Sequence, residues 1–282
     1  MSSPMTIYSP ESPLRHPGRF LAAMISDVFR SRELAWRLFV RDLSAQYRNS
    51  MLGYLWVFAP PLLASLPFIG LKYAGVVRMA DTPIPYAAYA IIGTTIWQTF
   101  VEALNSPLKA ALDARVMLTR INFPREAILL AGLMQVGFSF LVRLVLLAAV
   151  FAAFGLAPAA SAPLFFLGML AVASTGFASG MMLIPVGLLY GDVRQGLPIV
   201  TTFLMFVTPV LYPMPASGPA RTAMALNPLA PLVTTTRDWL TTGPSAHLAG
   251  FGLVSAATLL LLLFGWLLYR VALPHLIARL GN

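Results

Sequence analysis

Three polar residues recur at every fourth position within one long apolar segment: Gln135, Ser139 and Arg143. In a helix this spacing places all three on one face, so the sequence predicts an intramembrane polar stripe. A charge inside an apolar helix is costly and marks a functional site by default. The stripe either faces a subunit interface, a channel or a phosphate group, or Arg143 simply reaches the outer headgroups.

Glu102 is the one carboxylate that lies well inside another apolar segment. Measured from the ends of the two helices that share a side of the membrane, Arg143 lies on the order of 20 Å deep and Glu102 only about 6 Å deep. We therefore do not expect Glu102 to pair with Arg143.

Aromatic side chains follow one face of the segment that contains Glu102. The members of this set are Tyr86, Tyr89, Trp97 and Phe100. Flat aromatic faces stack well on sugar rings, so one hypothesis is that these residues line a glycan channel. The alternatives are an aromatic belt at the membrane surface or ordinary helix packing.

Several kinds of chemistry are excluded by what the chain lacks. A phosphate-binding loop of the G-x-x-x-x-G-K-[ST] type needs a lysine followed by serine or threonine, and neither Lys72 nor Lys109 is followed by one. The three histidines His16, His247 and His275 are far apart, and the chain has no cysteine. We therefore expect no catalytic residue, no metal site and no cofactor in this chain.

The composition indicates a membrane protein, because 58% of the 282 residues are hydrophobic and only 10% are charged, against roughly 25% charged in soluble domains. Six segments approach or exceed the roughly 20 apolar residues that a bilayer requires, and these must be helices. They cover residues 52–76, 86–106, 127–155, 163–190, 197–213 and 248–270. The predicted fold is an all-α integral membrane protein with six transmembrane helices, of which the fifth is the shortest.

Basic residues gather on one side of these spans. They are Arg15, Arg19, Arg30, Arg32, Arg37, Arg41, Arg48, Lys109, Arg115, Arg120, Arg125, Arg194, Arg270 and Arg279. The positive-inside rule then puts both termini in the cytosol. A net charge of +9 suits anionic lipid or phosphate partners, and no nucleic-acid partner is expected.

A cytosolic tail is predicted for residues 1–29 and an amphipathic helix for residues 30–50. Trp36, Phe39, Val40, Leu43 and Tyr47 form its apolar stripe, and charged residues occupy the opposite face. Such a helix lies flat at the membrane interface, either as a simple anchor or as a docking element. Beyond it, Gly53 can supply the bend into the first span, which Pro60 and Pro61 are expected to kink.

Four blocks, in order, resemble the permease subunits of type-2 ABC exporters, in particular the branch that exports O-antigen and other cell-surface polysaccharides. They are "VRDLSAQYRNSMLGYLWVFAPPLL", "GTTIWQTFVEALNSPLKAALDARVMLTRINFPREAILLAG", "YGDVRQGLPIVTTFLMFVTPVLYP" and "NPLAPLVTTTRDWL". The likeness covers nearly the whole chain from about Arg30. It implies a homodimer of six-span subunits in the bacterial inner membrane, joined to two cytosolic ATPase subunits that bind ATP and Mg²⁺.

The implied substrate is a polysaccharide linked through pyrophosphate to a polyprenyl lipid, and this chain alone is not an enzyme. An exporter of small lipids or drugs on the same fold is the first alternative. A membrane enzyme that uses polyprenyl phosphate is the second, although the acidic or histidine cluster that it needs is missing from the sequence.

The resemblance also assigns roles to segments of the permease domain, residues 51–282. A coupling loop at about 107–125 would contact the ATPase, and residues 213–246 would form an external gate or an ordinary external loop. The implied coupling residues are Arg115, Arg120, Asn122, Pro124, Arg125, Asp192 and Arg194. Arg41 and Arg48 are candidates for receiving the lipid pyrophosphate, although the positive-inside rule alone also explains them.

Overall fold

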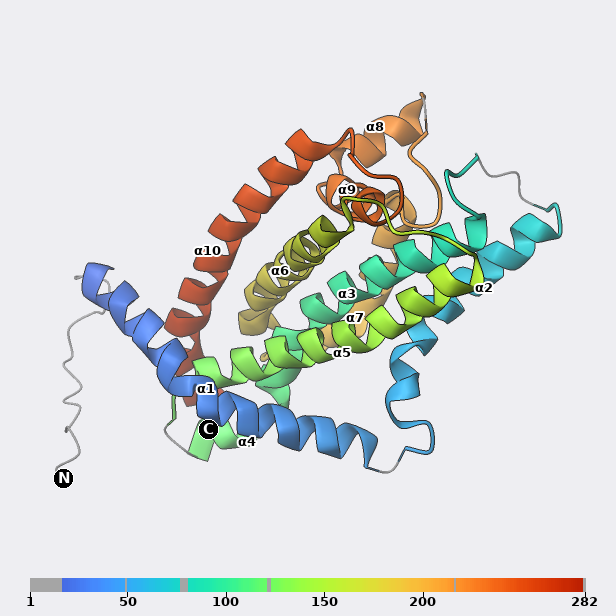
Figure 1. Cartoon of the computed structure of the whole chain (residues 1–282). Coiled ribbons are helices and arrows are strands. Elements are labelled where there is room, and N and C mark those ends of the chain that lie inside the picture. Colours follow the sequence, from blue (N-terminus) through green and yellow to red (C-terminus); the bar gives the residue numbers. More distant parts are fainter. Residues whose placement is uncertain (1–16, 49, 77–80, 121–122, 216, 281–282) are drawn as a thin grey trace.

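The computed structural model describes residues 17–48, 50–76, 81–120, 123–215 and 217–280, and these ranges contain helices and no strand (Figure 1). The helices are α1 (Pro17–Tyr47), η2 (Gly53–Val57), α2 (Ala59–Tyr73), α3 (Tyr86–Asp113), α4 (Arg115–Arg120), α5 (Glu126–Ala153), α6 (Ala162–Gly187), α7 (Asp192–Val207), α8 (Pro219–Leu226), α9 (Leu229–Thr241) and α10 (Leu248–Leu280). The all-α prediction is therefore confirmed for the described part of the chain.

Three helices in these ranges are long and apolar enough to cross a membrane: α5, α6 and the part of α10 from Leu248 to Leu276. The segments predicted as the first and fifth spans are shorter helices. With 15 and 16 residues, α2 and α7 extend only about 22 and 24 Å, less than the roughly 30 Å of hydrocarbon in a bilayer. The fifth segment begins earlier than predicted, at Asp192, and it ends earlier, at Val207, because the backbone is extended at Thr208.

The helix α3 forms the centre of the bundle, in contact with α2, α5, α6 and α9. It packs most closely on α6, where glycines remove the side chains that would keep the two backbones apart. A Cβ atom added at Gly180 would lie 2.2 Å from the carbonyl oxygen of Leu104, and one at Gly176 would lie 2.5 Å from that of Phe100. The glycines four residues apart on α6 therefore set the α3–α6 distance.

The helix α1 runs from Pro17 to Tyr47, so it begins 13 residues before the predicted start at residue 30. Its charged face is exposed as predicted, but Ala35, Leu38 and Phe39 are buried against the bundle, where α1 contacts α5. Trp36 and Val40, which were assigned to the same apolar stripe, remain exposed. Part of the stripe thus packs on the protein itself, because α5 offers an apolar face beside it.

The turn after α1 has the geometry that the sequence predicted. Gly53 adopts φ +51°, a left-handed conformation that favours glycine, and its N–H donates to the hydroxyl of Ser50. Pro60 and Pro61, however, lie in the first turn of α2. They begin the helix instead of kinking it, because proline lacks an N–H that the first helical turn does not need.

The short helices α8 and α9 lie at the end of the molecule opposite to α1 and α4 (Figure 1). The segment predicted as an external gate or loop thus contains two short helices, and its position outside a membrane stays a prediction. Asn227, between α8 and α9, bonds to the end of α7: its side-chain amide donates to the carbonyl of Val207 and to the hydroxyl of Thr208. This arrangement satisfies backbone groups that the end of a helix leaves without partners.

Candidate functional site

An ion pair joins α3 and α5 inside the bundle. Arg143 Nη2 lies 2.7 Å from Glu102 Oε2, and its Nη1 donates to the hydroxyl of Thr99 at 3.3 Å. Ser139 donates to Glu102 Oε1 at 2.6 Å. The side chain of Arg143 is 5% exposed and that of Glu102 25% exposed. Two of the three residues of the predicted stripe, Ser139 and Arg143, therefore contact one carboxylate.

The expectation that Glu102 does not pair with Arg143 is wrong. It assumed that the helix containing Glu102 ends at residue 106, whereas α3 continues through Pro107 to Asp113. The eleven residues from Glu102 to the end of α3 correspond to about 16 Å of helix, not 6 Å. Glu102 therefore lies much deeper than predicted, within reach of the long arginine side chain.

The third member of the stripe contacts the end of α1. Gln135 donates to the amide oxygen of Gln46 at 3.2 Å, and the neighbouring Tyr47 packs edge-on against Tyr54. Burial raises the pKa of the Tyr47 phenol, and the nearby Glu102 carboxylate raises it further. The end of α1 therefore contacts α5 through Gln46 and η2 through Tyr47.

A groove of about 520 Å³ lies between α1, α3 and α5, and Glu102 forms part of its lining. Nine of its thirteen lining residues have polar or charged side chains, although apolar atoms make up the larger part of the lining surface; the residues are Arg41, Asp42, Ala45, Gln46, Glu102, Asn105, Ser106, Lys109, Ala110, Asp113, Ala131, Gly132 and Gln135. The volume lies within the range of ligand sites. Of the two arginines predicted to receive the pyrophosphate, the structure brings Arg41 to the groove, where it pairs with Asp42 at 2.7 Å, and leaves Arg48 exposed outside its lining.

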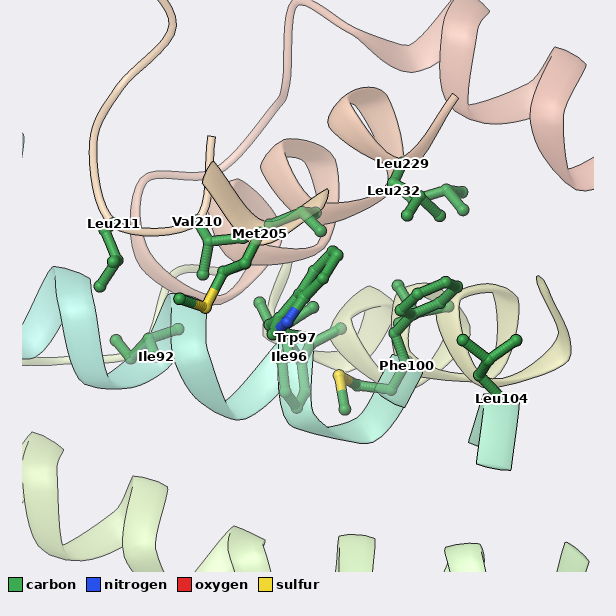
Figure 2. Packing of buried hydrophobic residues seen from close by; sticks show 14 of the residues in the cluster. Ile92, Ile96, Trp97, Phe100, Leu104, Met205, Val210, Leu211, Leu229 and Leu232 are labelled. Atoms are coloured by element: carbon green, nitrogen blue, oxygen red, sulfur yellow. The ribbon is translucent and has the colours of Figure 1, made fainter. Parts of the chain in front are cut away.

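The four aromatic residues that were predicted to line a glycan channel are buried within one chain. Tyr86, Tyr89, Trp97 and Phe100 are each at most 4% exposed. Figure 2 shows Trp97 and Phe100 projecting from α3 among buried apolar side chains of the hydrophobic core. The centroids of their two rings lie 5.2 Å apart. This burial supports the helix-packing alternative.

Arg237 is a buried cation in α9, where no site is predicted from the sequence. It is 3% exposed, donates to the carbonyls of Pro209 and Val210 at 3.1 Å each, and lies 3.8 Å from the centre of the Tyr89 ring. The break after α7 leaves these carbonyls without helical partners, and the guanidinium supplies two donors in a fixed plane. The proline at position 209 in an apolar run is the signal that could have indicated such a break.

Replacing Arg237 with methionine is expected to lower the free energy of unfolding by about 1–3 kcal/mol, because two buried carbonyls lose their donors. Lysine should restore only part of this loss, since an ammonium group lacks the planar fork. Thermal unfolding in detergent would measure the change, with the exposed Arg194 replaced by methionine as the control. Equal unfolding temperatures for the two variants would contradict the anchoring role.

The residues predicted to couple to an ATPase lie at the end of the molecule that carries α4. Arg115, Pro124, Asp192 and Arg194 are exposed, and Arg125 is partly exposed. Arg120 is the last residue of α4, but its side chain and the whole of Asn122 lie outside the described residues. Contact between these residues and an ATPase stays a prediction.

Three charged residues tie α1, α5 and α10 together near this end. Arg270 contacts Asp27 at 2.6 Å and Glu126 at 3.2 Å. The hydroxyl of Tyr269, which is 1% exposed, donates to the carbonyl of Arg125 at 2.9 Å. The loop before α5 is therefore bonded to the last helix, and a displacement of this loop would be felt by both.

Comparison with known proteins gives the context for this architecture. Residues 33–240 match the family model described as ABC-2 type transporter. The chain is 28% identical over 214 residues to the O-antigen export system permease protein RfbA of Myxococcus xanthus, covering 75% of this chain and 81% of that protein. It is 27% identical over 210 residues to a protein of the same name from Klebsiella pneumoniae, covering 72% and 78%. The matched region includes α2 to α8, α9 up to residue 240, the groove residues and the ion pair, and on this match the chain belongs to the ABC-2 type transporter family.

Proposed function

We propose that this chain is the membrane-spanning permease of an ATP-driven exporter that moves a polyprenyl-pyrophosphate-linked polysaccharide across the bacterial inner membrane. It would work as a homodimer with two cytosolic ATPase subunits, with six spans per chain and both termini in the cytosol. The observation that carries the proposal is the match to O-antigen export permeases over about three quarters of the chain, 75% and 72% for the two relatives. The basic side of the spans supports the orientation.

The predicted coupling loop fits this role. Arg125, just before α5, accepts a hydrogen bond from Tyr269 of α10, and Arg270 of α10 pairs with Glu126, the first residue of α5, and with Asp27 of α1. An ATPase that pushes on this loop would therefore move the ends of three helices together. The external helices α8 and α9, at the opposite end, would then form the outer gate.

Deletion of the gene in the producing cell is expected to reduce surface polysaccharide at least tenfold and to leave lipid-linked glycan on the cytosolic side, because export would stop while synthesis continues. The glycan would be measured with a surface-specific lectin or antibody, and the lipid-linked pool by extraction. Expression of the wild-type chain should restore export.

Restoration should fail when the partner ATPase carries an alanine in place of its nucleotide-binding lysine. Surface polysaccharide that persists after deletion would contradict the proposal. Loss of a small lipid at the outer face, with normal polysaccharide, would favour the alternative exporter.

A further inference from the structure

We infer that the groove between α1, α3 and α5 binds neutral sugar residues through their hydroxyl groups. The inference rests on the proposed function and deepens it, because it places glycan recognition on the polar groove and not on the aromatic face of α3. The occupant would be two or three sugars of the glycan, held on the side of the molecule that carries the basic residues.

The groove offers the hydrogen-bonding groups that a sugar needs. Gln135 donates to Gln46, which leaves the amide oxygen of Gln135 as an acceptor. Asn105 donates to the carbonyl of Val101, which leaves its own amide oxygen as an acceptor. Ser106 supplies a hydroxyl from α3, and the partly exposed carboxylate of Glu102 also lines the groove. Hydroxyl groups both donate and accept, so a sugar can satisfy amides, carboxylates and hydroxyls together.

The charges of the groove balance. Its cations are Arg41 and Lys109, and its acids are Asp42, Glu102 and Asp113. Arg41 pairs with Asp42, and Arg143, which is not part of the lining, pairs with Glu102. The two remaining charges of the groove, Lys109 and Asp113, are opposite in sign. A site without net positive charge favours a neutral ligand over a pyrophosphate, because the anion would gain little attraction in return for its lost hydration.

The aromatic face of α3 does not compete for the sugar in this conformation. Trp97 is 2% and Phe100 4% exposed within the core, so neither ring presents a face for stacking. The groove residues Arg41, Asp42, Lys109 and Asp113 are exposed to solvent, so a ligand in the groove stays partly hydrated. A hydrated, hydroxyl-rich ligand accounts for the lining of the groove.

The test uses Ala45, a small exposed residue of the groove wall, and its neighbour Ser44, which is exposed but outside the lining. Ala45→Phe fills the groove without removing a polar group. The probe is a neutral hexasaccharide cut from the cell's own surface polysaccharide and titrated calorimetrically into the permease–ATPase complex in nanodiscs. We expect at least tenfold weaker binding for Ala45→Phe and unchanged binding for Ser44→Phe.

A second variant, Gln135→Ala, carries the test if Ala45→Phe does not fold, and it should weaken binding severalfold. Inorganic pyrophosphate, added as a competitor, should not displace the hexasaccharide. Wild-type affinity in both variants, displacement by pyrophosphate, or absence of binding to the wild-type complex would overturn the inference. If the wild-type complex exports glycan in cells while any of these results is found, the groove assignment fails and the proposed function stands. Failure of the wild-type complex to export glycan would instead refute the proposed function.

Discussion

Replacing Arg143 with leucine is expected to lower the free energy of unfolding by about 3–5 kcal/mol, because it leaves the Glu102 carboxylate without its counter-charge in the interior. Arg143 is 5% exposed and bonds both Glu102 and Thr99, so water has little access with which to replace it. Folded yield and the thermal unfolding temperature in detergent would measure the loss. Surface glycan in complemented cells should fall in parallel.

Substitution of the other partner distinguishes the contribution of the ion pair from the contribution of each charged residue alone. Glu102→Gln should also destabilise, because the buried guanidinium then loses its charge partner. The double variant Glu102→Gln/Arg143→Gln should recover much of the loss, since no unpaired charge remains. Additive losses in the double variant, or normal export and stability in Arg143→Leu, would show that the arginine reaches the headgroups and that the ion pair is not important.

Replacing Gly180 with valine is the second change from which a large effect is expected. Its Cβ would lie 2.2 Å from the carbonyl oxygen of Leu104, and backbone cannot move aside as a flexible side chain can. The helices α3 and α6 must then separate, at a cost of about 3 kcal/mol. We expect loss of folded protein on size-exclusion chromatography and a lower unfolding temperature.

The matched control is Gly137→Val on α5, where an added Cβ meets nothing within 4 Å in the described structure. This variant should give the same yield of folded protein as the wild type. A stable Gly180→Val protein would mean that α3 and α6 tolerate a wider spacing. In that case the close approach of the two helices would not be what holds the bundle together.

The ion pair and the groove are parts of one arrangement, since Glu102 belongs to both. The pair holds the carboxylate in the groove lining, while the hydrogen bond between Gln135 and Gln46 joins α5 to α1. A displacement of α1 or of the loop before α5 would change the groove width. In the proposed function, substrate recognition and coupling to the ATPase would share α1 and α5, because both helices line the groove and both contact Arg270 of α10.

The amino-acid sequence by itself determined the local features of this protein. The spacing of Gln135, Ser139 and Arg143 fixes a common face because a helix repeats every 3.6 residues. The glycine at position 53 fixes the turn after α1 because its left-handed φ excludes most other residues. Long apolar runs fixed the helical class, because backbone groups in lipid must bond within their own segment.

Only the tertiary structure decided which faces meet and at what depth. Helical periodicity gives the direction of a side chain around its axis but not its height relative to another helix. Extending α3 from residue 106 to Asp113 moves Glu102 by about 10 Å from the helix end, and this changes it from a remote carboxylate to the partner of Arg143. In the same way, the aromatic face of α3 became core because glycines let α6 approach it, and Arg237 found its acceptors in a break of α7 that lies 27 residues away.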